Sequence, residues 1–496
     1  MGAFRQAIEN ETKWTKTWNG EDALRTTSSK CLDFFGRAGA MRSTDKMDKL
    51  NTFDAAFKED KDIAVKLLFY TRDIRGGYGE RDTFNEIFAH LANINKESVV
   101  KNLWAVLEFG RAKDLYSLIG TSAENEMWDF MRKQFELDLR NMELGKPVSL
   151  LAKWIATPDS SSEKTKKLGK LTASKLGYTY KTMREYKKKL RALRRYLDIP
   201  EIKMAQNNWG EIEYSNLPSK CMLKNRDAFK RPDEERYLEF INRVNSGEVK
   251  MNMGTVAPCD IIQKVACGKY TPDLEAMWSS LPDMNNGNAM VICDTSGSMW
   301  GWDELRETDV KPGTVAFALA IYFAERNKGD LKDLFMTFSD EPEFVELDGI
   351  TLEQKFNKLY NANWDGSTNL EAAFDLLLTT CVRNKVPQNE LPESLVIISD
   401  MQINCVSGLD LNNRMTFYDK MSRKYEQAGY KMPQVVFWNV NASNSTFHAS
   451  ADVAGVSMVS GYSPNIFKQV MENIGTTPYE LMMAVVNDER YANITA

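Results

Sequence analysis

Val291-Ile-Cys-Asp-Thr-Ser-Gly-Ser-Met299 is the stretch that decides the fold of the carboxyl-terminal half. It overlaps an apolar run, 289–293, that predicts a short buried strand ending in a turn. Asp294, Ser296 and Ser298 occupy alternate positions of that turn, and one carboxylate with two hydroxyls suits Mg²⁺, which takes few protein charges. An ordinary polar turn has the same composition, so the rest of the chain must decide between these two interpretations.

Strands and helices alternate after the turn Asn285-Asn-Gly-Asn288, which places a domain boundary between residues 284 and 285. Such alternation predicts an α/β Rossmann-like domain whose mostly parallel sheet is covered by helices on both faces. Its ligand site is expected at the carboxyl ends of the strands, near the topological switch point. The predicted strands are 289–293, 334–338, 344–347, 394–399, 435–440 and 456–460, and the predicted helices are 314–326, 370–381, 416–428, 464–474 and 479–486.

Two further oxygen ligands stand at ends of these predicted elements. Thr368 lies in Asp365-Gly-Ser-Thr-Asn369, just before a predicted helix, and Asp400 ends the apolar strand Leu395-Val-Ile-Ile-Ser-Asp400. A carboxylate buried at a strand end is costly unless it meets a cation. Two carboxylates and three hydroxyls on three loops therefore favour a metal site over a polar turn.

The order of these residues resembles the metal-ion-dependent adhesion site (MIDAS) of von Willebrand factor A domains, and the resemblance covers about 285–486. It implies hydroxyl ligands and two carboxylates that bind directly or through water. It also implies Mg²⁺ (or Mn²⁺ or Ca²⁺) as cofactor and an open coordination position for an Asp or Glu of a partner protein. The implied metal residues are Asp294, Ser296, Ser298, Thr368 and Asp400.

The region 1–284 is predicted to be all-α. Apolar residues recur at helical spacing from Phe53 onward, as in Phe84, Ile87, Phe88 and Leu91, and strand-like alternation is nearly absent before residue 210. Antiparallel helix pairs stacked as a HEAT-like solenoid fit this pattern, and an irregular helical bundle is the alternative.

The segment 164–195 carries thirteen Lys and Arg residues and one acid, so its charge of +12 leaves −17 on the rest of a chain whose net charge is −5. Such segregation suggests a polyanion partner, because each phosphate that is neutralised releases counterions. Interleaved tyrosines such as Tyr178 and Tyr180 could stack on bases. The alternative is a basic helix pair that docks on the acidic remainder of the chain.

The candidate RNA-contacting residues of this segment are Lys164, Lys166, Lys167, Lys170, Lys181, Arg184, Lys187, Lys188, Lys189, Arg191, Arg194 and Arg195. A second basic feature is the turn Arg75-Gly-Gly-Tyr-Gly79, where Arg72, Arg75 and Arg81 are candidates for phosphate contact. An ordinary helix-to-helix turn is the alternative there, because the turn matches neither a P-loop nor a dinucleotide fingerprint.

The chain as a whole resembles the DUF2828-type family of plants, bacteria and phages, which joins a helical region to such an A domain. That architecture is similar to the Ro (TROVE) ribonucleoproteins, in which a ring of helical repeats binds structured and misfolded RNAs and the A domain closes the ring. No residue-level motif carries RNA-binding positions over from those proteins. The resemblance rests on Arg72-Asp-Ile-Arg-Gly-Gly-Tyr-Gly-Glu-Arg81, Ser149-Leu-Leu-Ala-Lys-Trp154, Asp233-Glu-Glu-Arg-Tyr237 and Val459-Ser-Gly-Tyr-Ser-Pro464.

Composition excludes several classes of function. With 43% apolar and 27% charged residues the chain of 496 residues is of the folded, soluble type. Seven scattered cysteines without a C-x-x-C pair indicate reduced thiols, and only His90 and His448 are available for His-dependent triads or zinc sites. No signal-peptide core and no run near the ~18 apolar residues of a membrane helix is present. We therefore expect a cytoplasmic protein without a membrane partner.

Three functions remain open from the sequence. We expect a non-enzymatic, Ro-like RNA-binding protein whose helical region binds RNA and whose A domain carries a Mg²⁺ site. The alternative is a metal-dependent protein-interaction scaffold that does not bind RNA. A metal-dependent phosphoryl-transfer enzyme such as a nuclease is the third, but no general base and no second metal site is visible, so no catalytic residue is assigned.

Overall fold

The computed structural model describes residues 11–284, 288–294, 296–300, 305–307, 309–338, 341–347, 349, 351–362, 368–404, 415–442 and 446–496. The chain forms two compact units, each assembled from three separate segments. The sheet unit consists of Met1–Ile63, Gly76–Tyr78 and Met253–Glu489, and the helical unit consists of Ala64–Arg75, Gly79–Asn252 and Arg490–Ala496.

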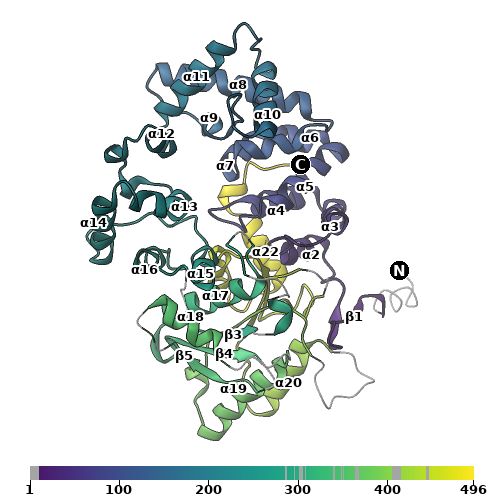
Figure 1. Ribbon diagram of the computed structural model, residues 1–496. Helices are drawn as coiled ribbons and strands as arrows, with labels where there is room; N and C mark the ends of the chain where they lie inside the picture. The colour runs from purple at the N-terminus through teal and green to yellow at the C-terminus, as the bar shows by residue number, and fades with distance from the viewer. Residues whose placement is uncertain are drawn as a thin grey trace. The chain divides into compact units, whose positions relative to one another are not determined.

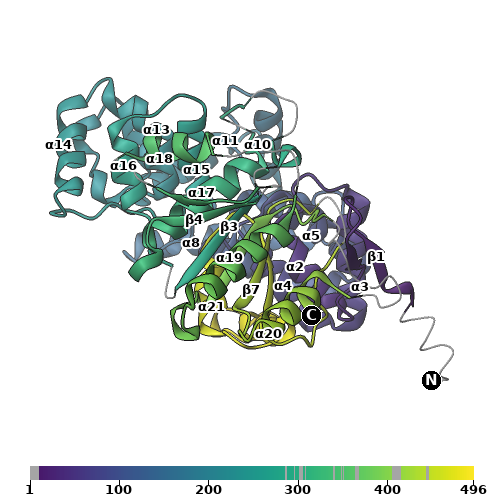
Figure 2. The same cartoon turned by 90° about the horizontal axis from the view of Figure 1, so that it is seen from below.

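The sheet unit contains a six-stranded sheet in the order β5-β4-β3-β6-β7-β8 (Figures 1 and 2). Its strands are β3 (Ala289–Asp294), β4 (Leu334–Phe338), β5 (Phe344–Glu346), β6 (Ser394–Ser399), β7 (Gln434–Asn439) and β8 (Val456–Ser460). All are parallel except β5, which pairs antiparallel with β4 at one edge. Successive strands extend from β3 toward β5 on one side, and the chain then returns to β6 on the other side. The topological switch point therefore lies between β3 and β6, and the prediction of a mostly parallel sheet is confirmed.

Five helices of the sheet unit match the predicted ones, namely α17 (Pro312–Arg326), α19 (Leu370–Asn384), α20 (Phe417–Gln427), α21 (Asn465–Glu472) and α22 (Pro478–Val486). The other helices lie outside the predicted alternation. They are α2 (Lys30–Ala38), α3 (Lys46–Glu59), α15 (Pro258–Ala266) and α16 (Pro272–Ser279), which precede the first strand of the sheet, and α18 (Leu352–Tyr360), which was not predicted.

Apolar side chains explain why the sheet is covered on both faces. Every residue of β3, β6, β7 and β8 is buried, as expected for parallel strands between two helical layers. Phe323 of α17 packs against Trp438 of β7 and Phe467 of α21. Helices α19 and α20 lie side by side across the strands from α17, where Phe374 contacts Tyr425 (Figure 1).

The sheet unit begins far before the predicted boundary between 284 and 285. An antiparallel hairpin, β1 (Trp14–Lys16) and β2 (Asp22–Leu24), lies in the region predicted to be all-α. Helix α2 approaches β8 so closely that a Cβ on Gly39 would lie 2.7 Å from the carbonyl oxygen of Ser460. Glu21 and Lys420 form a buried ion pair at 2.6 Å. These partners stand 421 and 399 positions apart in sequence, which is beyond the reach of any local sequence pattern.

The helical unit contains α4 (Lys61–Arg72), which begins in the sheet unit, and the ten helices that follow it. These are α5 (Asp82–Ile94), α6 (Lys96–Lys101), α7 (Leu103–Phe109), α8 (Glu124–Glu143), α9 (Leu151–Trp154), α10 (Glu163–Lys175), α11 (Met183–Tyr196), α12 (Pro200–Ala205), α13 (Ser219–Lys230) and α14 (Glu234–Asn245). No strand occurs in the described residues of this unit, so the all-α prediction is confirmed for it.

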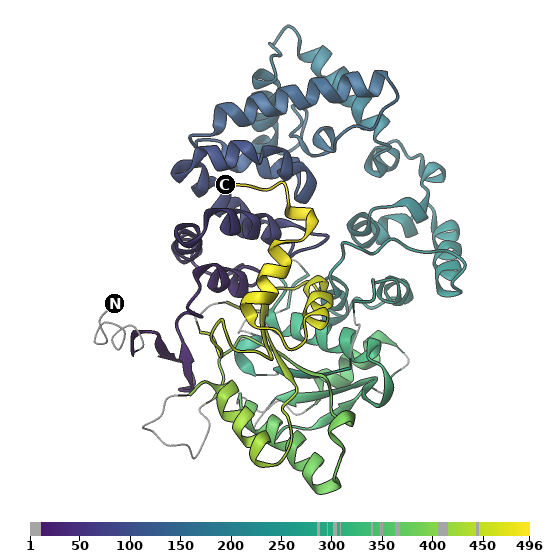
Figure 3. The ribbon, with the colours of Figure 1, turned by 180° about the vertical axis from the view of Figure 1, so that it is seen from behind.

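Helices of this unit pack largely against near neighbours in sequence, for example α8 against α9 and α11, and α13 against α14. The final segment 490–496 also belongs here (Figure 3). Arg490 forms an ion pair with Asp73, and the hydroxyl of Tyr491 donates to the same carboxylate at 3.0 Å. Across the described part of the chain, no helix has the length and apolar character needed to cross a membrane.

Candidate functional site

Asp294 lies at the carboxyl end of β3, at the topological switch point. Its side chain is fully buried. The hydroxyl of Ser399, at the end of the neighbouring strand β6, donates to Asp294 Oδ2 at 2.6 Å, and the backbone N–H of Ser296 donates to Oδ1 at 2.9 Å. The orientation of this carboxylate is therefore fixed by groups from two adjacent strands.

Asp400 follows β6 directly and brings a second buried carboxylate to the same edge of the sheet. It accepts hydrogen bonds from the Ser298 hydroxyl and, at 3.2 Å, from the backbone N–H of Gln402. Ser298 Oγ also lies 3.0 Å from Ser296 Oγ. The structure thus brings Asp294, Ser296, Ser298 and Asp400 together, as the sequence pattern predicts.

The two carboxyl groups oppose each other's ionisation. Burial, and then the negative charge of Asp400, raise the pKa of Asp294. Burial also raises the pKa of Asp400. Two buried like charges need either a proton or a cation between them. A proton or a cation at this edge of the sheet would relieve the repulsion between the two carboxylates.

Thr368, the fifth predicted ligand, is buried and held by the loop that follows Asp400. Its Oγ1 lies 2.8 Å from the carbonyl oxygen of Gln402 and 2.7 Å from Oδ1 of Asn404. Gln402 thus contacts Asp400 through its N–H and Thr368 through its carbonyl. The remaining residues of the predicted motifs, Thr295 and 365–367, lie outside the described residues.

The donor set fits a hard cation. Carboxylate and hydroxyl oxygens are the ligands that Mg²⁺ prefers, together with water. The adjacent Cys293 offers no thiolate, because burial raises its pKa well above the usual range. In the part of the chain that the structure describes, no three His, Cys, Asp or Glu side chains gather to hold a metal. A cation at this site would therefore depend on the hydroxyls as well as on the two carboxylates.

Three residues that contact these ligands were not predicted. Ser399 and Gln402 stand beside Asp400 in sequence, but a hydroxyl or amide near a strand end has no distinctive pattern. Asn19 lies in the turn of the β1–β2 hairpin, and its Nδ2 donates to Thr368 Oγ1 and to the carbonyl of Gln402, both at 2.6 Å. It stands 349 positions from Thr368, so no sequence spacing could reveal it.

The structure separates the predicted RNA-contacting residues of the helical unit by their partners. Arg72 is buried and forms an ion pair with Asp114 at 2.8 Å. Arg194 donates to two backbone carbonyls and, at 3.0 Å, to the hydroxyl of Thr157. Both guanidinium groups hold the helical unit together, so the prediction that they contact RNA lacks structural support.

Four further candidates, of which three are half-buried and Arg81 is exposed, are already paired with acids. These ion pairs are Lys166 with Glu163, Lys187 with Asp159, Lys189 with Glu185, and Arg81 with Asp82. The remaining nine candidates are exposed and form no ion pair with any described residue. They are Arg75, Lys164, Lys167, Lys170, Lys181, Arg184, Lys188, Arg191 and Arg195.

Four of these unpaired cations form a stripe on α11, which we call the cationic stripe. Arg184, Lys188, Arg191 and Arg195 follow one another at spacings of four, three and four residues, so they share one face of the helix. The opposite face buries Tyr186, Leu190 and Leu193. The apolar face docks the helix on its neighbours, and the stripe is left to solvent.

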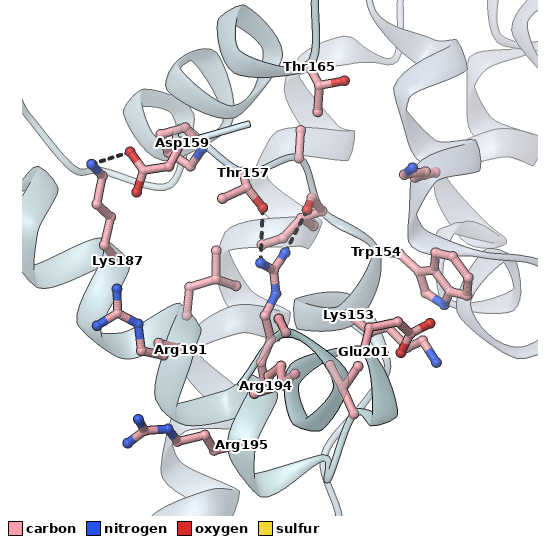
Figure 4. A pocket seen from close by; sticks show the side chains of 18 of the residues that line it. Lys153, Trp154, Thr157, Asp159, Thr165, Lys187, Arg191, Arg194, Arg195 and Glu201 are labelled. Carbon is pink, nitrogen blue, oxygen red and sulfur yellow. Dashed lines mark hydrogen bonds and ion pairs between the residues drawn. The ribbon is translucent and has the colours of Figure 1, made fainter. Parts of the chain in front are cut away.

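A cavity of about 540 Å³ lies beside the stripe (Figure 4). Its wall includes the apolar side chains of Leu190, Ile199 and Ile202. Its cations are Lys113, Lys153, Lys187, Arg191, Arg194 and Arg195, against Asp159 and Glu201. In Figure 4 the hydrogen bonds of Arg194 are drawn, whereas the guanidinium groups of Arg191 and Arg195 have no partner among the residues shown. The cavity thus combines an apolar wall with unpaired positive charge.

Lys113 and Lys153 were missed because both lie outside the basic segment 164–195. Trp154, which follows Lys153, also lines the cavity, and Arg111 lies over its ring at 4.6 Å from the centroid. The run Ser149–Trp154 carries part of the family resemblance, and it is the sequence signal for this part of the cavity wall.

Comparisons with known proteins cover both halves of the chain. The family model described as Domain of unknown function (DUF2828) matches residues 17–146 and 134–292, and the one described as Domain of unknown function (DUF7788) matches residues 288–493. Uncharacterized protein L728 of Acanthamoeba polyphaga mimivirus is 29% identical over 514 residues, which cover 95% of this chain and 86% of that protein. The crystal structure of the Deinococcus radiodurans RO (RSR) protein is similar with a TM-score of 0.48 and 14% identity, over 94% of this chain and 100% of that chain.

Proposed function

This chain belongs to the DUF2828 family, and we propose that it is a non-enzymatic RNA-binding protein whose helical unit carries the binding surface. The observation that carries this proposal is the cationic stripe of α11, which is exposed and free of ion pairs within the described residues. The stripe spans the twelve residues 184–195, or about 16 Å of helix, which is long enough to contact several phosphates of one strand.

The pairing pattern argues against the alternative in which the basic helices dock on acidic parts of the same chain. Docking of that kind would neutralise the stripe. Instead the acids of the unit pair with Lys166, Lys187 and Lys189 and leave the four stripe residues open to solvent. A free polyanion is the partner that restores charge balance and releases counterions.

The cavity beside the stripe supports a single-stranded RNA more than a duplex. Arg191 and Arg195 belong to both the stripe and the cavity, so a strand whose phosphates follow the stripe passes the cavity opening. An apolar wall formed by Leu190 and Ile199 suits an unstacked base, which is how proteins usually read RNA. A base-paired strand has no free base to insert.

Charge reversal tests this function. The variant Lys188→Glu/Arg191→Glu/Arg195→Glu should bind a single-stranded RNA oligonucleotide at least about tenfold more weakly near 0.1 M salt. The slope of log K against log salt should shrink by about 2, because three phosphate contacts are lost. Fluorescence anisotropy over a salt series measures both quantities.

The control changes the same net charge at paired positions, in Lys166→Glu/Lys187→Glu/Lys189→Glu. Its loss of affinity should be clearly smaller, since these lysines already have acidic partners. Equal losses of affinity in the two triple variants would mean that net charge alone, and not the stripe, determines binding. Salt-independent binding of the unaltered protein would overturn the proposal.

For the sheet unit we propose a Mg²⁺ site formed by Asp294, Ser296, Ser298, Thr368 and Asp400. The buried, mutually repelling carboxylates are the observation that supports it. When bound, the cation would neutralise both carboxylates and keep an open position for water or for an acidic side chain of a partner protein. That second role is the metal-dependent scaffold, which a partner captured in Mg²⁺ and released by EDTA would favour.

Asp294→Ala provides the test of the cation itself. Isothermal titration with MgCl₂ should show one site in the unaltered protein and none in the variant. The unfolding temperature of the unaltered protein should rise with Mg²⁺, because a ligand of the folded state stabilises it by mass action. A Mg²⁺ response that survives in Asp294→Ala would place the cation elsewhere.

A further inference from the structure

The β1–β2 hairpin contacts the loop of the proposed cation site through four consecutive residues of its own turn. The Thr17 hydroxyl donates to the carbonyl of Ile403 at 2.6 Å, and the backbone N–H of Trp18 donates to Gln402 Oε1 at 2.7 Å. Gly20 forms a β-bridge with Asn404. Every one of these partners lies in the segment directly after Asp400. The turn of the hairpin is therefore hydrogen-bonded to the loop that follows Asp400.

Asn19 makes the contact that matters for the cation. Its Nδ2 donates to Thr368 Oγ1 and to the carbonyl of Gln402, both at 2.6 Å. Thr368 is 3% exposed, whereas Asn19 is an exposed residue at the tip of a turn. An exposed asparagine has no packing reason to reach a buried hydroxyl, so its contribution lies in the hydrogen bonds.

These bonds determine which way the Thr368 hydroxyl faces. A hydroxyl has one proton and two lone pairs. Asn19 occupies one lone pair, and the proton is directed to the carbonyl of Gln402 or to Asn404 Oδ1. The second lone pair faces whichever of these two oxygens does not take the proton, so a cation would replace that contact while the bond from Asn19 keeps Oγ1 oriented. Outer contacts of this kind commonly change metal affinity by about 10- to 100-fold.

We propose that Asn19 is a positioning residue of the cation site and that Mg²⁺ binding is coupled to docking of the hairpin, residues 14–24. The proposal rests on the Mg²⁺ site proposed above. Coupling is reciprocal, so a hairpin that orients the ligand for the cation is itself held more firmly when the cation is bound. The cation would then help to hold the amino-terminal hairpin on the loop that follows β6.

The test measures Mg²⁺ affinity and hairpin protection in the full-length protein. Asn19→Ala should weaken Mg²⁺ binding about tenfold in isothermal titration. In the unaltered protein, hydrogen exchange of residues 14–24 should slow on addition of Mg²⁺, and in Asn19→Ala this slowing should disappear. In EDTA the unfolding temperature of Asn19→Ala should be slightly lower than that of the unaltered protein, because two hydrogen bonds are lost, and Mg²⁺ should widen this difference.

Two matched variants separate positioning from mere attachment. Thr17→Val removes a hairpin bond of the same length without touching Thr368, so it should weaken Mg²⁺ binding clearly less than Asn19→Ala does. Trp18→Ala, at a side chain 84% exposed, should leave affinity unchanged. Equal effects of Thr17→Val and Asn19→Ala would overturn the positioning role.

The outcomes distinguish this inference from the site on which it rests. If the unaltered protein binds Mg²⁺ and Asp294→Ala does not, yet Asn19→Ala binds within twofold of the unaltered protein, only the role of Asn19 is refuted. If the unaltered protein binds no Mg²⁺, both the cation site and the coupling are refuted.

Discussion

His448 is a buried residue whose surroundings keep it neutral. Its Nε2 lies 3.2 Å from the carbonyl oxygen of Met401, and its ring packs against Phe437 with centroids 5.2 Å apart. Its Nδ1 finds no hydrogen-bond partner among the described residues. Burial lowers the pKa of His448 from 6.5 to about 4.

This lowered pKa predicts a loss of stability in mild acid. Above pH 6.5 the imidazole is neutral in both the folded and the unfolded chain, so it adds no pH dependence. Between pH 6.5 and 4 only the unfolded chain takes up the proton, and the free energy of unfolding falls by up to about 3 kcal/mol. Urea denaturation at pH 7 and at pH 4.5 measures the free energy of unfolding. Its fall between these two pH values should be larger in the unaltered protein than in His448→Gln. Equal falls in the two proteins would contradict the prediction.

Single residues also show how far the sequence could specify the cation site. Asp294, Ser296, Ser298 and Asp400 follow buried strands, and neighbouring parallel strands end at one edge, so their proximity was predictable. The orientation of their side chains was not, because it depends on contacts such as Asn19 to Thr368. The same holds for the basic residues. The number of cations can be read from the sequence, but the burial of Arg72 against Asp114 cannot.

At the scale of elements, the packing of α10 depends on Gly169. A Cβ at this position would lie 2.3 Å from the backbone carbon of Thr157 and 2.5 Å from the nitrogen of Pro158. Both neighbours are backbone atoms of the segment that lines the cavity, so neither can move aside alone. The helix and the cavity wall therefore fit only when this residue lacks a side chain.

Gly169→Ala should accordingly destabilise the protein by about 1 to 3 kcal/mol, the usual range for overpacking, although alanine favours a helix over glycine. Chemical denaturation followed by circular dichroism measures this change. Ser174→Ala, at an exposed position of the same helix, should change the free energy of unfolding by no more than about 0.5 kcal/mol. An unchanged free energy of unfolding in Gly169→Ala would show that the backbone at Thr157 and Pro158 shifts at little cost.

Elements differ in how well the sequence predicted them. Strands β3, β4, β6, β7 and β8 agree with the predicted ranges to within one residue, because each is a buried apolar run between turn signals. The hairpin strands β1 and β2 have three residues each and no alternating pattern, so they were missed. They are strands because they pair with each other and are attached to distant loops, as in the bridge between Leu24 and Phe447.

At the scale of the whole molecule, neither unit is a continuous stretch of chain. Nearly all of the helical unit is inserted between two segments of the sheet unit, and residues 490–496 form the last segment of the helical unit. Local composition follows the change from helices to alternating strands near residue 285, and it carries no information on the long-range contacts of α2 with β8 and α22.

Because the sheet unit is discontinuous, some of its elements are synthesised long before the elements that they pack against. Helix α2 is synthesised early, but its partner β8 ends at Ser460, more than 400 residues later. At about 5 to 20 residues per second, α2 waits roughly 20 to 80 seconds for that strand. Phe34 finds its ring partner Phe53 soon after α2 is made, but Gly36 and Gly39, which face Met458 and Ser460 of β8, have no strand against them during this interval. A chaperone that binds the nascent chain in this period would find that face of α2 uncovered.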